Sequence, residues 1–379
     1  MLFAVSGVEL PGMKDLFKKD PILCISGILA VVSCFFVTPD AEYISYINFR
    51  VLAILFSLML VVAELLRIGT FDFLTNKLLS KVKSSRYVSM MLVVLSFFMA
   101  MLLTNDVTLV TLVPFAIAVL RAFGDRKGLM FTLILMTVAA NLGSMLTPIG
   151  NPQNLYLYTA YGMSFVPFIK LMLPYALVSL VLLVVSVFLF AGNRNAASGA
   201  SEEKKRPDTV RLVLCLLLFV FCVLSVADIV SWFIMFPVVV LIMLLVDRKA
   251  FKYADLMLLL TFVFFFVLIG NLGRISVIHD TLSEVVSVSP MLTAVFASQI
   301  ISNVPAAMLL SAFTDNGEAL VIGTNLGGLG TLIASMASLI TYKFYNGLPK
   351  DRKGPYLLSF TVVNIVFLVL LLGLYYIMP

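Results

Sequence analysis

The chain has 379 residues and a net charge of +6, and 61% of its residues are hydrophobic while only 12% are charged. Its mean hydropathy is +1.10. Soluble domains are about 45–50% apolar, so this composition excludes an ordinary soluble protein. It indicates a multi-pass protein of the plasma (inner) membrane, with the lipid bilayer as its surroundings.

The positive charge sets the orientation of the chain and does not indicate nucleic acid as a partner. If the spans alternate as described below, all but three of the 26 Lys and Arg residues fall on one face of the membrane. The exceptions are Arg50, Lys170 and Arg274. The positive-inside rule makes the crowded face cytoplasmic, which predicts a cytoplasmic N-terminus and an external C-terminus.

The first half begins with two spans and a hairpin. A helix crosses a bilayer with about 20 apolar residues, and residues 21–38 and 50–66 come close to that length. The next apolar run, residues 87–121, has basic residues at both ends and Thr104-Asn105-Asp106 at its middle. Two full spans with a tight external turn stay open, but we predict a re-entrant hairpin with its polar tip inside the membrane.

A broken span follows. Residues 129–163 contain prolines, glycines and asparagines where the bilayer is deepest, so they cannot form one continuous helix. Residues 165–191 return to the cytoplasm and end the first repeat, residues 1–192. The polar segment 193–210 is predicted to be a cytoplasmic linker.

The second repeat, residues 211–379, shows the same order of elements. Its hairpin, residues 290–314, breaks at Ser302-Asn303 and has acidic flanks, so it enters from the outside. A second broken span runs through residues 319–342, and unbroken spans are predicted at 211–227, 229–246, 256–272 and 355–378. The predicted fold is an all-α polytopic membrane protein with two inverted repeats, about nine spans and two re-entrant hairpins. The unbroken helices are expected to form a scaffold around the part that carries the site.

The two broken spans are related in sequence. Residues 141–158 read NLGSMLTPIGNPQNLYLY and residues 325–342 read NLGGLGTLIASMASLITY, with seven identities in eighteen ungapped positions. The shared residues include Asn, Gly and Thr, which lipid does not select. This is an internal repeat, and opposed repeats are typical of secondary transporters.

Each helix break exposes free amides, which suit anions, and free carbonyls, which suit small cations. Asn and Thr at these breaks also cap broken helices in soluble proteins, but their convergence from two repeats favours a binding site. The candidate site residues are Thr104, Asn105, Asp106, Thr108, Thr147, Gly150, Asn151, Asn154, Ser302, Asn303, Thr324, Asn325, Gly330, Thr331 and Ser335.

These residues also carry a family resemblance. The sequences TNDVTLVTLVP at 104–114, TPIGNPQN at 147–154 and SNVPAAMLL at 302–310 resemble elements of the ion transporter superfamily. That superfamily includes divalent anion/sodium symporters, citrate permeases, arsenite efflux permeases and sodium/proton antiporters of the NhaD type. Its symporters have Ser-Asn-Thr at each hairpin tip and a TPIGTPPN-like motif in the first broken helix.

The resemblance implies an elevator mechanism with substrate between the two tips and a cation near each. Na⁺ would lie near Asn105, Asp106 and Gly150, and near Asn303 and Asn325. Neither tip is Ser-Asn-Thr, because Asp106 and Val304 occupy the third positions. The Asn-Asp pair is closer to the arsenite and NhaD-like branches.

The predicted function is secondary active transport of a small anion, a carboxylate or inorganic oxyanion, coupled to Na⁺ or H⁺. An alternative is Na⁺/H⁺ exchange at Asp106, and another is arsenite-type efflux. An enzyme is not expected. The chain has one histidine and lacks the HExxH and GxGD motifs of intramembrane proteases, and it has no Walker A motif for ATP. No cofactor is expected besides the coupling ion, and a homodimer stays open. Glu64 is expected to reach the cytoplasmic surface, and His279 to lie in an external loop.

Overall fold

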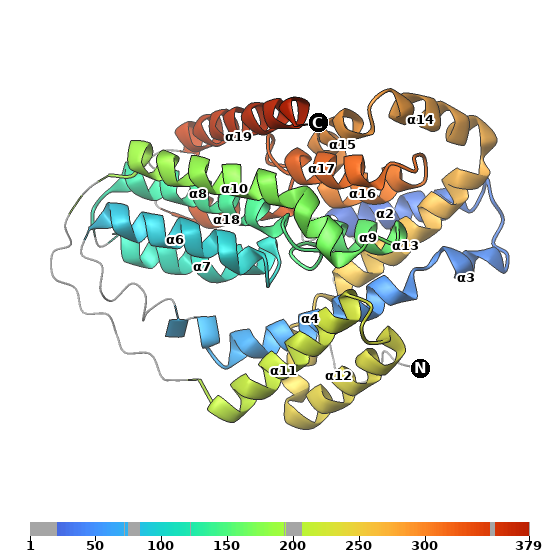
Figure 1. Cartoon of the computed structure of the whole chain (residues 1–379), viewed down its shortest axis with the longest axis horizontal. Helices are drawn as coiled ribbons and strands as arrows, with labels where there is room; N and C mark the ends of the chain where they lie inside the picture. The colour runs from blue at the N-terminus through green and yellow to red at the C-terminus, as the bar shows by residue number, and fades with distance from the viewer. Residues whose placement is uncertain are drawn as a thin grey trace.

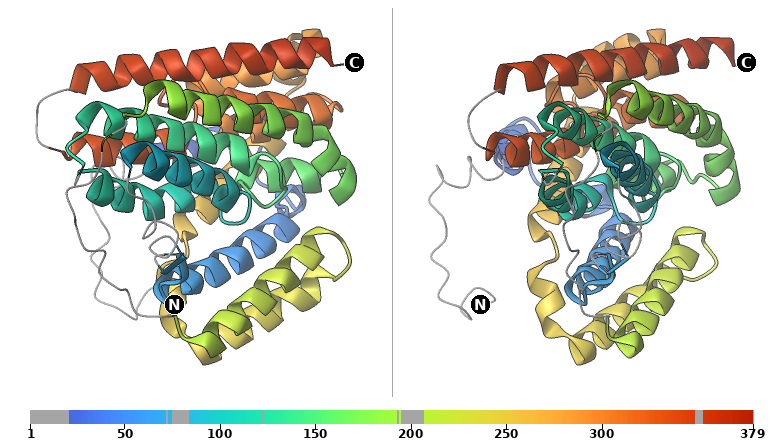
Figure 2. Two further views of the ribbon diagram at one scale, coloured as in Figure 1. Left: turned by 60° about the vertical axis from the view of Figure 1, so that its left-hand side comes forward. Right: turned by 90° about the vertical axis from the view of Figure 1, so that its left-hand side faces the viewer.

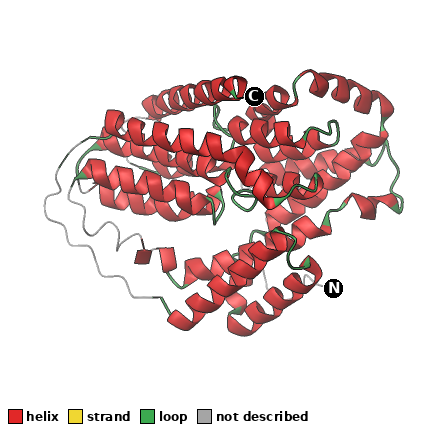
Figure 3. Ribbon diagram, viewed as in Figure 1, coloured by secondary structure: helices red, strands yellow, loops and turns green. Residues whose placement is uncertain are grey.

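The computed structural model describes residues 21–71, 73–74, 84–121, 123–192, 194, 207–348 and 353–378. Its described part is built of helices and contains no strand (Figures 1 and 3), which confirms the predicted all-α class. Most of the predicted linker, 193–210, lies outside the described residues.

Six described helices are long and apolar enough to cross a membrane by themselves. They are α4 (Phe49–Arg67), α8 (Arg126–Ser144), α10 (Phe165–Phe190), α11 (Thr209–Val226), α13 (Leu256–Arg274) and α19 (Lys353–Ile377). The helices α2 (Pro21–Ser33) and α12 (Trp232–Val246) are apolar but shorter than the spans predicted there. Two of the predicted spans are therefore shorter helices than the apolar runs indicated.

Each predicted hairpin is a pair of packed helices. In the first, α6 (Ser85–Ala100) packs against α7 (Asn105–Arg121) across a short turn, and in the second, α15 (Pro290–Ile301) packs against α16 (Asn303–Ser311). The second turn is a single residue, Ser302, whose φ of 74° is a left-handed value that costs a non-glycine residue about 1–3 kcal/mol. Strain of this kind persists only where surrounding contacts fix the backbone.

Both predicted helix breaks are present. In the first half, α8 ends at Ser144 and α9 (Pro152–Ala160) begins after an unwound stretch, with Asn151 accepting a hydrogen bond from the Asn154 amide as its cap. In the second half, α17 (Gly317–Gly327) and α18 (Met336–Asn346) are separated in the same way. Pro152 at the first position of α9 supplies no amide hydrogen, so a helix can begin there but not continue through it.

The two hairpins and the two broken helices interlock in a symmetric manner. The first helix of each hairpin packs on the first half of the broken helix in its own repeat, α6 on α8 and α15 on α17. The second helix packs on the far half of the opposite repeat, α7 on α18 and α16 on α9. Each hairpin tip is therefore held by both halves of the chain.

The unbroken helices do not form one separate scaffold. Figures 1 and 2 show α4 beside α11 and α12, apart from the hairpins, and these helices contact one another. By contrast, α10 packs on α6 and α8, and α19 packs on α8, α10 and α17. The expectation that every unbroken helix belongs to the scaffold was wrong for α10 and α19.

Glu64 and His279 do not lie where the sequence predicted them. Glu64 of α4 is fully buried and does not reach the surface, because Arg67 and Arg211 hold its carboxylate at 3.1 and 3.3 Å. His279 lies on α14 (Ser276–Val288), a helix and not a loop, which meets α15 at a bend of 112°. The helix α14 is short and about half of its residues are polar, so its sequence does not resemble a membrane span.

Candidate functional site

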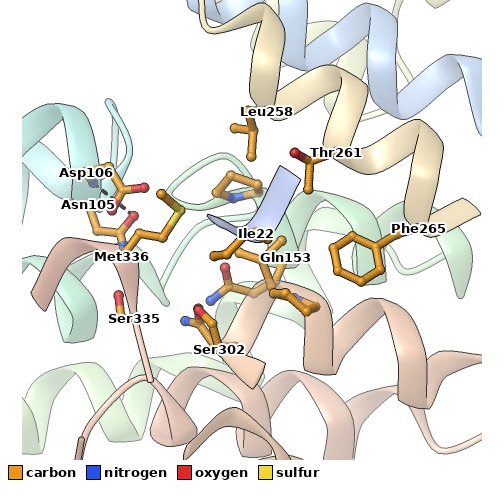
Figure 4. A pocket seen from close by; sticks show the side chains of 14 residues that line it. Ile22, Asn105, Asp106, Gln153, Leu258, Thr261, Phe265, Ser302, Ser335 and Met336 are labelled. Carbon is orange, nitrogen blue, oxygen red and sulfur yellow. Dashed lines mark hydrogen bonds between the residues drawn. The ribbon is translucent and has the colours of Figure 1, made fainter. Parts of the chain in front are cut away.

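The two hairpin tips line one pocket. Asn105 and Asp106 contribute from the first tip, and Ser302 and Asn303 from the second (Figure 4). The second halves of the broken helices contribute Pro152 and Gln153 of α9, Met336 of α18, and Ser335 directly before α18. Ile22 of α2 and three residues of α13, Leu258, Thr261 and Phe265, also line it.

Four helices begin at this pocket. The first residues of α7, α9, α16 and α18 are Asn105, Pro152, Asn303 and Met336, and all four line it. Helix N-termini carry free amides and the positive end of the helix dipole. Four positive helix ends therefore meet at a pocket that has no Lys, Arg or His among the described residues that line it.

Equivalent positions of the two repeats form matching hydrogen bonds between the two broken helices. Asn151 donates to the side-chain oxygen of Asn325 at 3.1 Å, and Ser335 donates to that of Asn141 at 2.9 Å. In the ungapped repeat alignment Asn141 matches Asn325, and Asn151 matches Ser335. Asn105 of the first tip joins the same network by donating to Asn141 at 3.0 Å.

Equivalent threonines tie each unwound stretch to its hairpin. Thr147 donates to the carbonyl of Met101 at 2.6 Å, and Thr331 donates to the carbonyl of Gln299 at 3.2 Å. Helix glycines permit a close approach in both halves: a Cβ on Gly143 would collide with the backbone of Phe97, and one on Gly327 with the side chain of Ser298. Glycine is required where two backbones come this close.

The two unwound stretches differ in how their free carbonyls are held. In the first half Asn154 donates to the carbonyls of Ser144, Met145 and Thr147. In the second half this role falls to Gln299, a hairpin residue that sequence reasoning did not include. Its side chain donates to the carbonyls of Gly327 and Leu329 at 2.8 and 2.9 Å and accepts from the Thr331 amide at 2.9 Å.

Asp106 does not cap the second hairpin helix of its tip. The α7 cap is Thr104, whose hydroxyl accepts from the Val107 amide at 3.4 Å. The Asp106 oxygen Oδ1 is buried and has no hydrogen-bond partner among the described residues. Asp106 is also the one ionisable side chain among the described residues that line the pocket.

The predicted site residues fall into three groups. Asn105, Asp106, Ser302, Asn303 and Ser335 line the pocket. Behind it, the helix breaks are formed or held by Thr147, Gly150, Asn151, Asn154, Asn325, Gly330 and Thr331. The remaining three, Thr104, Thr108 and Thr324, are not pocket residues; Thr324 bonds to Leu320 of its own helix.

Gln153 is a buried polar pocket residue that the sequence reasoning missed. Its side chain is 1% exposed, and both its amide nitrogen and its amide oxygen lack a partner among the described residues. The signal that could have found it is its place in the TPIGNPQN motif, at the second position of a half-helix that begins at the break.

Comparisons with known proteins agree with this architecture. A family model described as citrate transporter matches residues 16–316. The chain belongs to the citrate transporter family. It is an integral membrane transporter, and its long apolar helices agree with that assignment.

The chain is similar in sequence to several other membrane proteins. It is 32% identical over 336 residues to an uncharacterized transporter of Methanocaldococcus jannaschii, covering 88% of this chain and 90% of the relative. It is 31% identical over 339 residues to the inner membrane protein YbiR of Escherichia coli, covering 86% and 89%. A putative transporter, arsB, of Dictyostelium discoideum is 30% identical over 196 residues, which covers 50% of this chain and 34% of the relative.

Proposed function

We propose that the protein is a secondary active transporter of a small oxygen-rich anion, coupled to Na⁺ or H⁺. The observation that carries this proposal is the convergence of four helix N-termini from both halves on one pocket. Such termini bind oxyanions through backbone amides and need no cationic side chain. The family description names citrate, and the resemblance of the Asn105-Asp106 pair to the arsenite branch makes an inorganic oxyacid a second class of substrate.

Asp106 is proposed as the coupling group. Burial of a carboxylate oxygen without a partner is unfavourable, and a bound cation or proton would relieve it. Its oxygen Oδ1 has no partner among the described residues. Na⁺ is proposed near Asn105, Asp106 and Gly150, and near Asn303 and Asn325, where unwound backbone offers carbonyls.

Alternating access is proposed to move the hairpins and broken helices as one body against α4, α11 and α12. The matched contacts made by Asn141 and Asn325 support an inverted repeat, because each half repeats the interactions of the other. The proposed orientation has the N-terminus in the cytoplasm and the C-terminus outside, in the plasma or inner membrane. A homodimer is the proposed assembly, in which the helices away from the pocket would make the contact.

Uptake into proteoliposomes tests the function. Purified protein should accumulate a radiolabelled anion from a panel of citrate, succinate, sulfate, phosphate and arsenite, and only when a Na⁺ or pH gradient is imposed. Empty liposomes and protein without a gradient serve as controls. Failure to move any anion under either gradient would refute the proposal.

A second candidate is exchange of Na⁺ for H⁺ without an anion. It is favoured by Asp106 being the one ionisable residue among the described pocket residues. Under this alternative an outward Na⁺ gradient would drive H⁺ inward and acidify the liposome lumen in buffers that contain no transportable oxyanion. The anion transporter would leave the lumen unchanged in those buffers.

A further inference from the structure

A second cavity, which we call the vestibule, lies apart from the pocket at the hairpin tips. It is bounded by the segment 45–50, which joins α3 (Glu42–Tyr46) to α4, and by α9, the start of α12 and the second half of α13. None of its described lining residues also lines the pocket. Its volume is about 520 Å³, which lies within the range of about 300–1,000 Å³ that small-molecule sites commonly have.

Aromatic rings form much of the wall of the vestibule. They belong to Tyr46, Phe49, Tyr156, Trp232 and Phe266. The Tyr46 ring packs so closely on Gly270 that a Cβ there would collide with it, and Arg274 donates to the Tyr46 hydroxyl at 3.0 Å. The Tyr156 hydroxyl is hydrogen-bonded to that of Ser311 at 2.7 Å. Both tyrosine hydroxyls are thus paired, and the wall suits a flat apolar group.

Arg50 is the one Lys, Arg, His, Asp or Glu among the described residues that line the vestibule. Its Nη2 donates to Oδ1 of Asp228 at 2.6 Å, but its Nε is buried and has no partner among the described residues. Guanidinium donors come in pairs that hold a carboxylate by two parallel hydrogen bonds. Asp228 uses one donor of this pair, and a buried donor left unpaired costs about 1–3 kcal/mol.

The Asp228 carboxylate is a partner that a ligand can displace. The Asp228 side chain is 62% exposed, whereas that of Arg50 is 27% exposed. Exposed ion pairs contribute only about 0–1 kcal/mol, since water readily replaces one partner. A ligand carboxylate that accepts from both Nε and Nη2 of Arg50 would satisfy the donor that Asp228 leaves unpaired.

Two helix N-termini add positive potential to that of Arg50. Phe49 and Trp232, the first residues of α4 and α12, both line the vestibule. Ser231, directly before α12, makes no side-chain hydrogen bond to the helix amides. Free amides and the positive end of the helix dipole favour an anion.

We propose that the vestibule binds an aromatic carboxylate. Its carboxylate takes both donors of Arg50 in place of Asp228, and its ring packs against the aromatic wall. Each part of the ligand is needed, because a ring without charge leaves the Nε hydrogen unpaired and a small carboxylate leaves the wall uncovered. This site is separate from the pocket at the tips and does not rest on the proposed transport.

Trp232 is the single tryptophan of the chain and lines the vestibule, so tryptophan fluorescence of the purified full chain reports occupancy. The probes are 3-phenylpropionate, propionate without the ring, 3-phenylpropan-1-ol without the charge, and octanoate with a lipid-like chain. We expect 3-phenylpropionate to change the emission saturably. Its half-saturating concentration should be about tenfold lower than those of the other three.

Variants of the ion pair should act in opposite directions. Arg50→Gln removes the charge and should raise the half-saturating concentration of 3-phenylpropionate about tenfold or more. Arg50→Lys keeps the charge without the paired donors and should also raise it. Asp228→Asn removes the competing carboxylate and should lower it, and asparagine tolerates the φ of 60° at this position. Lys170→Gln is the matched control, because Lys170 is exposed on α10, which does not line the vestibule.

An emission that 3-phenylpropionate leaves unchanged in the wild-type protein would overturn the inference. Equal binding of propionate or of 3-phenylpropan-1-ol would do so too, and so would unchanged binding in Arg50→Gln. Octanoate binding as tightly as 3-phenylpropionate would instead identify an acyl chain as the occupant and contradict the aromatic class. All of these measurements are made without an ion gradient, so they stand whether or not the protein moves an anion.

Discussion

Asn151 and Asn325, which belong to the broken helices of opposite halves, are joined by a hydrogen bond of 3.1 Å from Nδ2 to Oδ1. Asn325 in turn donates to the side-chain oxygen of Asn154 at 2.6 Å. All three side chains are at most 2% exposed. The two halves of the chain are thus connected by buried amides, which have no water to replace a lost partner.

The first prediction concerns this connection. Asn151→Ala and Asn325→Ala should each lower the free energy of unfolding by about 1–3 kcal/mol, because each leaves a buried amide unpaired. Together they should be non-additive by about 0.5 kcal/mol or more, since residues that share a hydrogen bond couple. A double-mutant cycle of unfolding in detergent measures this coupling. Additive losses would mean that the two residues act independently.

The second prediction concerns the hairpin tips. Asn105→Ala and Asn303→Ala should reduce transport strongly with normal expression, because both residues line the pocket and are 4% exposed. Loss of one hydrogen bond to a charged ligand is worth about 1.5–3 kcal/mol, or roughly a tenfold to hundredfold loss of affinity. Initial uptake rates over a range of substrate concentrations would measure it. Wild-type uptake in both variants would remove the site from the tips.

The third prediction concerns access to the tips. Single cysteines at positions 105 and 303, placed in a chain whose Cys24, Cys34, Cys215 and Cys222 have been replaced, should react slowly with membrane-impermeant thiol reagents. Substrate should slow the reaction further, because the tips lie against the pocket. A cysteine at exposed Asp280 serves as the fast-reacting control. Rapid external labelling at position 105 under every condition would indicate two ordinary spans and not a hairpin.

The fourth prediction concerns Gln299, whose counterpart in the first hairpin is Met101: the carbonyls of both residues accept a hydrogen bond from an equivalent threonine. Gln299→Met should release two carbonyls and one amide of the second unwound stretch. The unfolding midpoint should fall, and the cysteine at position 303 should become more reactive. Gln299→Glu keeps the side-chain oxygen that accepts from the Thr331 amide, so that hydrogen bond should be retained. An unchanged reactivity would show that the Gln299 hydrogen bonds do not hold the second unwound stretch.

How far the sequence predicted the structure depended on the kind of signal. Two packed hairpins and two helix breaks followed from polar residues and prolines at bilayer depth, because lipid leaves such residues few places to go. Short helices such as α14 were missed, since they are not long apolar runs. Burial of Glu64 was missed because its partner Arg211 lies far along the chain and only tertiary packing brings the two together.

The sequence predicted only part of the candidate site. The repeat identified asparagines such as Asn141 and Asn325 as important, but it could not separate those that line the pocket from those that hold the backbone behind it. Gln153 was passed over because it lies between two motif asparagines and has no counterpart of its type in the second repeat. Its role depends on which atoms are left without partners, a property of the folded chain.

The last prediction concerns Asp106 and the coupling ion. Asp106→Asn would be silent if Asp106 only capped α7. The structure excludes that role, because Thr104 supplies the α7 cap and an Asp106 oxygen remains unpaired among the described residues. Asparagine keeps the shape of the side chain and removes its charge. A transporter that couples through this carboxylate should therefore lose its dependence on Na⁺ or pH even where substrate still binds. Thr104→Val, which removes the cap and keeps the carboxylate, is the matched control and should lower stability while leaving the cation dependence intact. Uptake measured against Na⁺ concentration and against pH in both variants distinguishes the two roles, and unchanged cation dependence in Asp106→Asn would eliminate the coupling role.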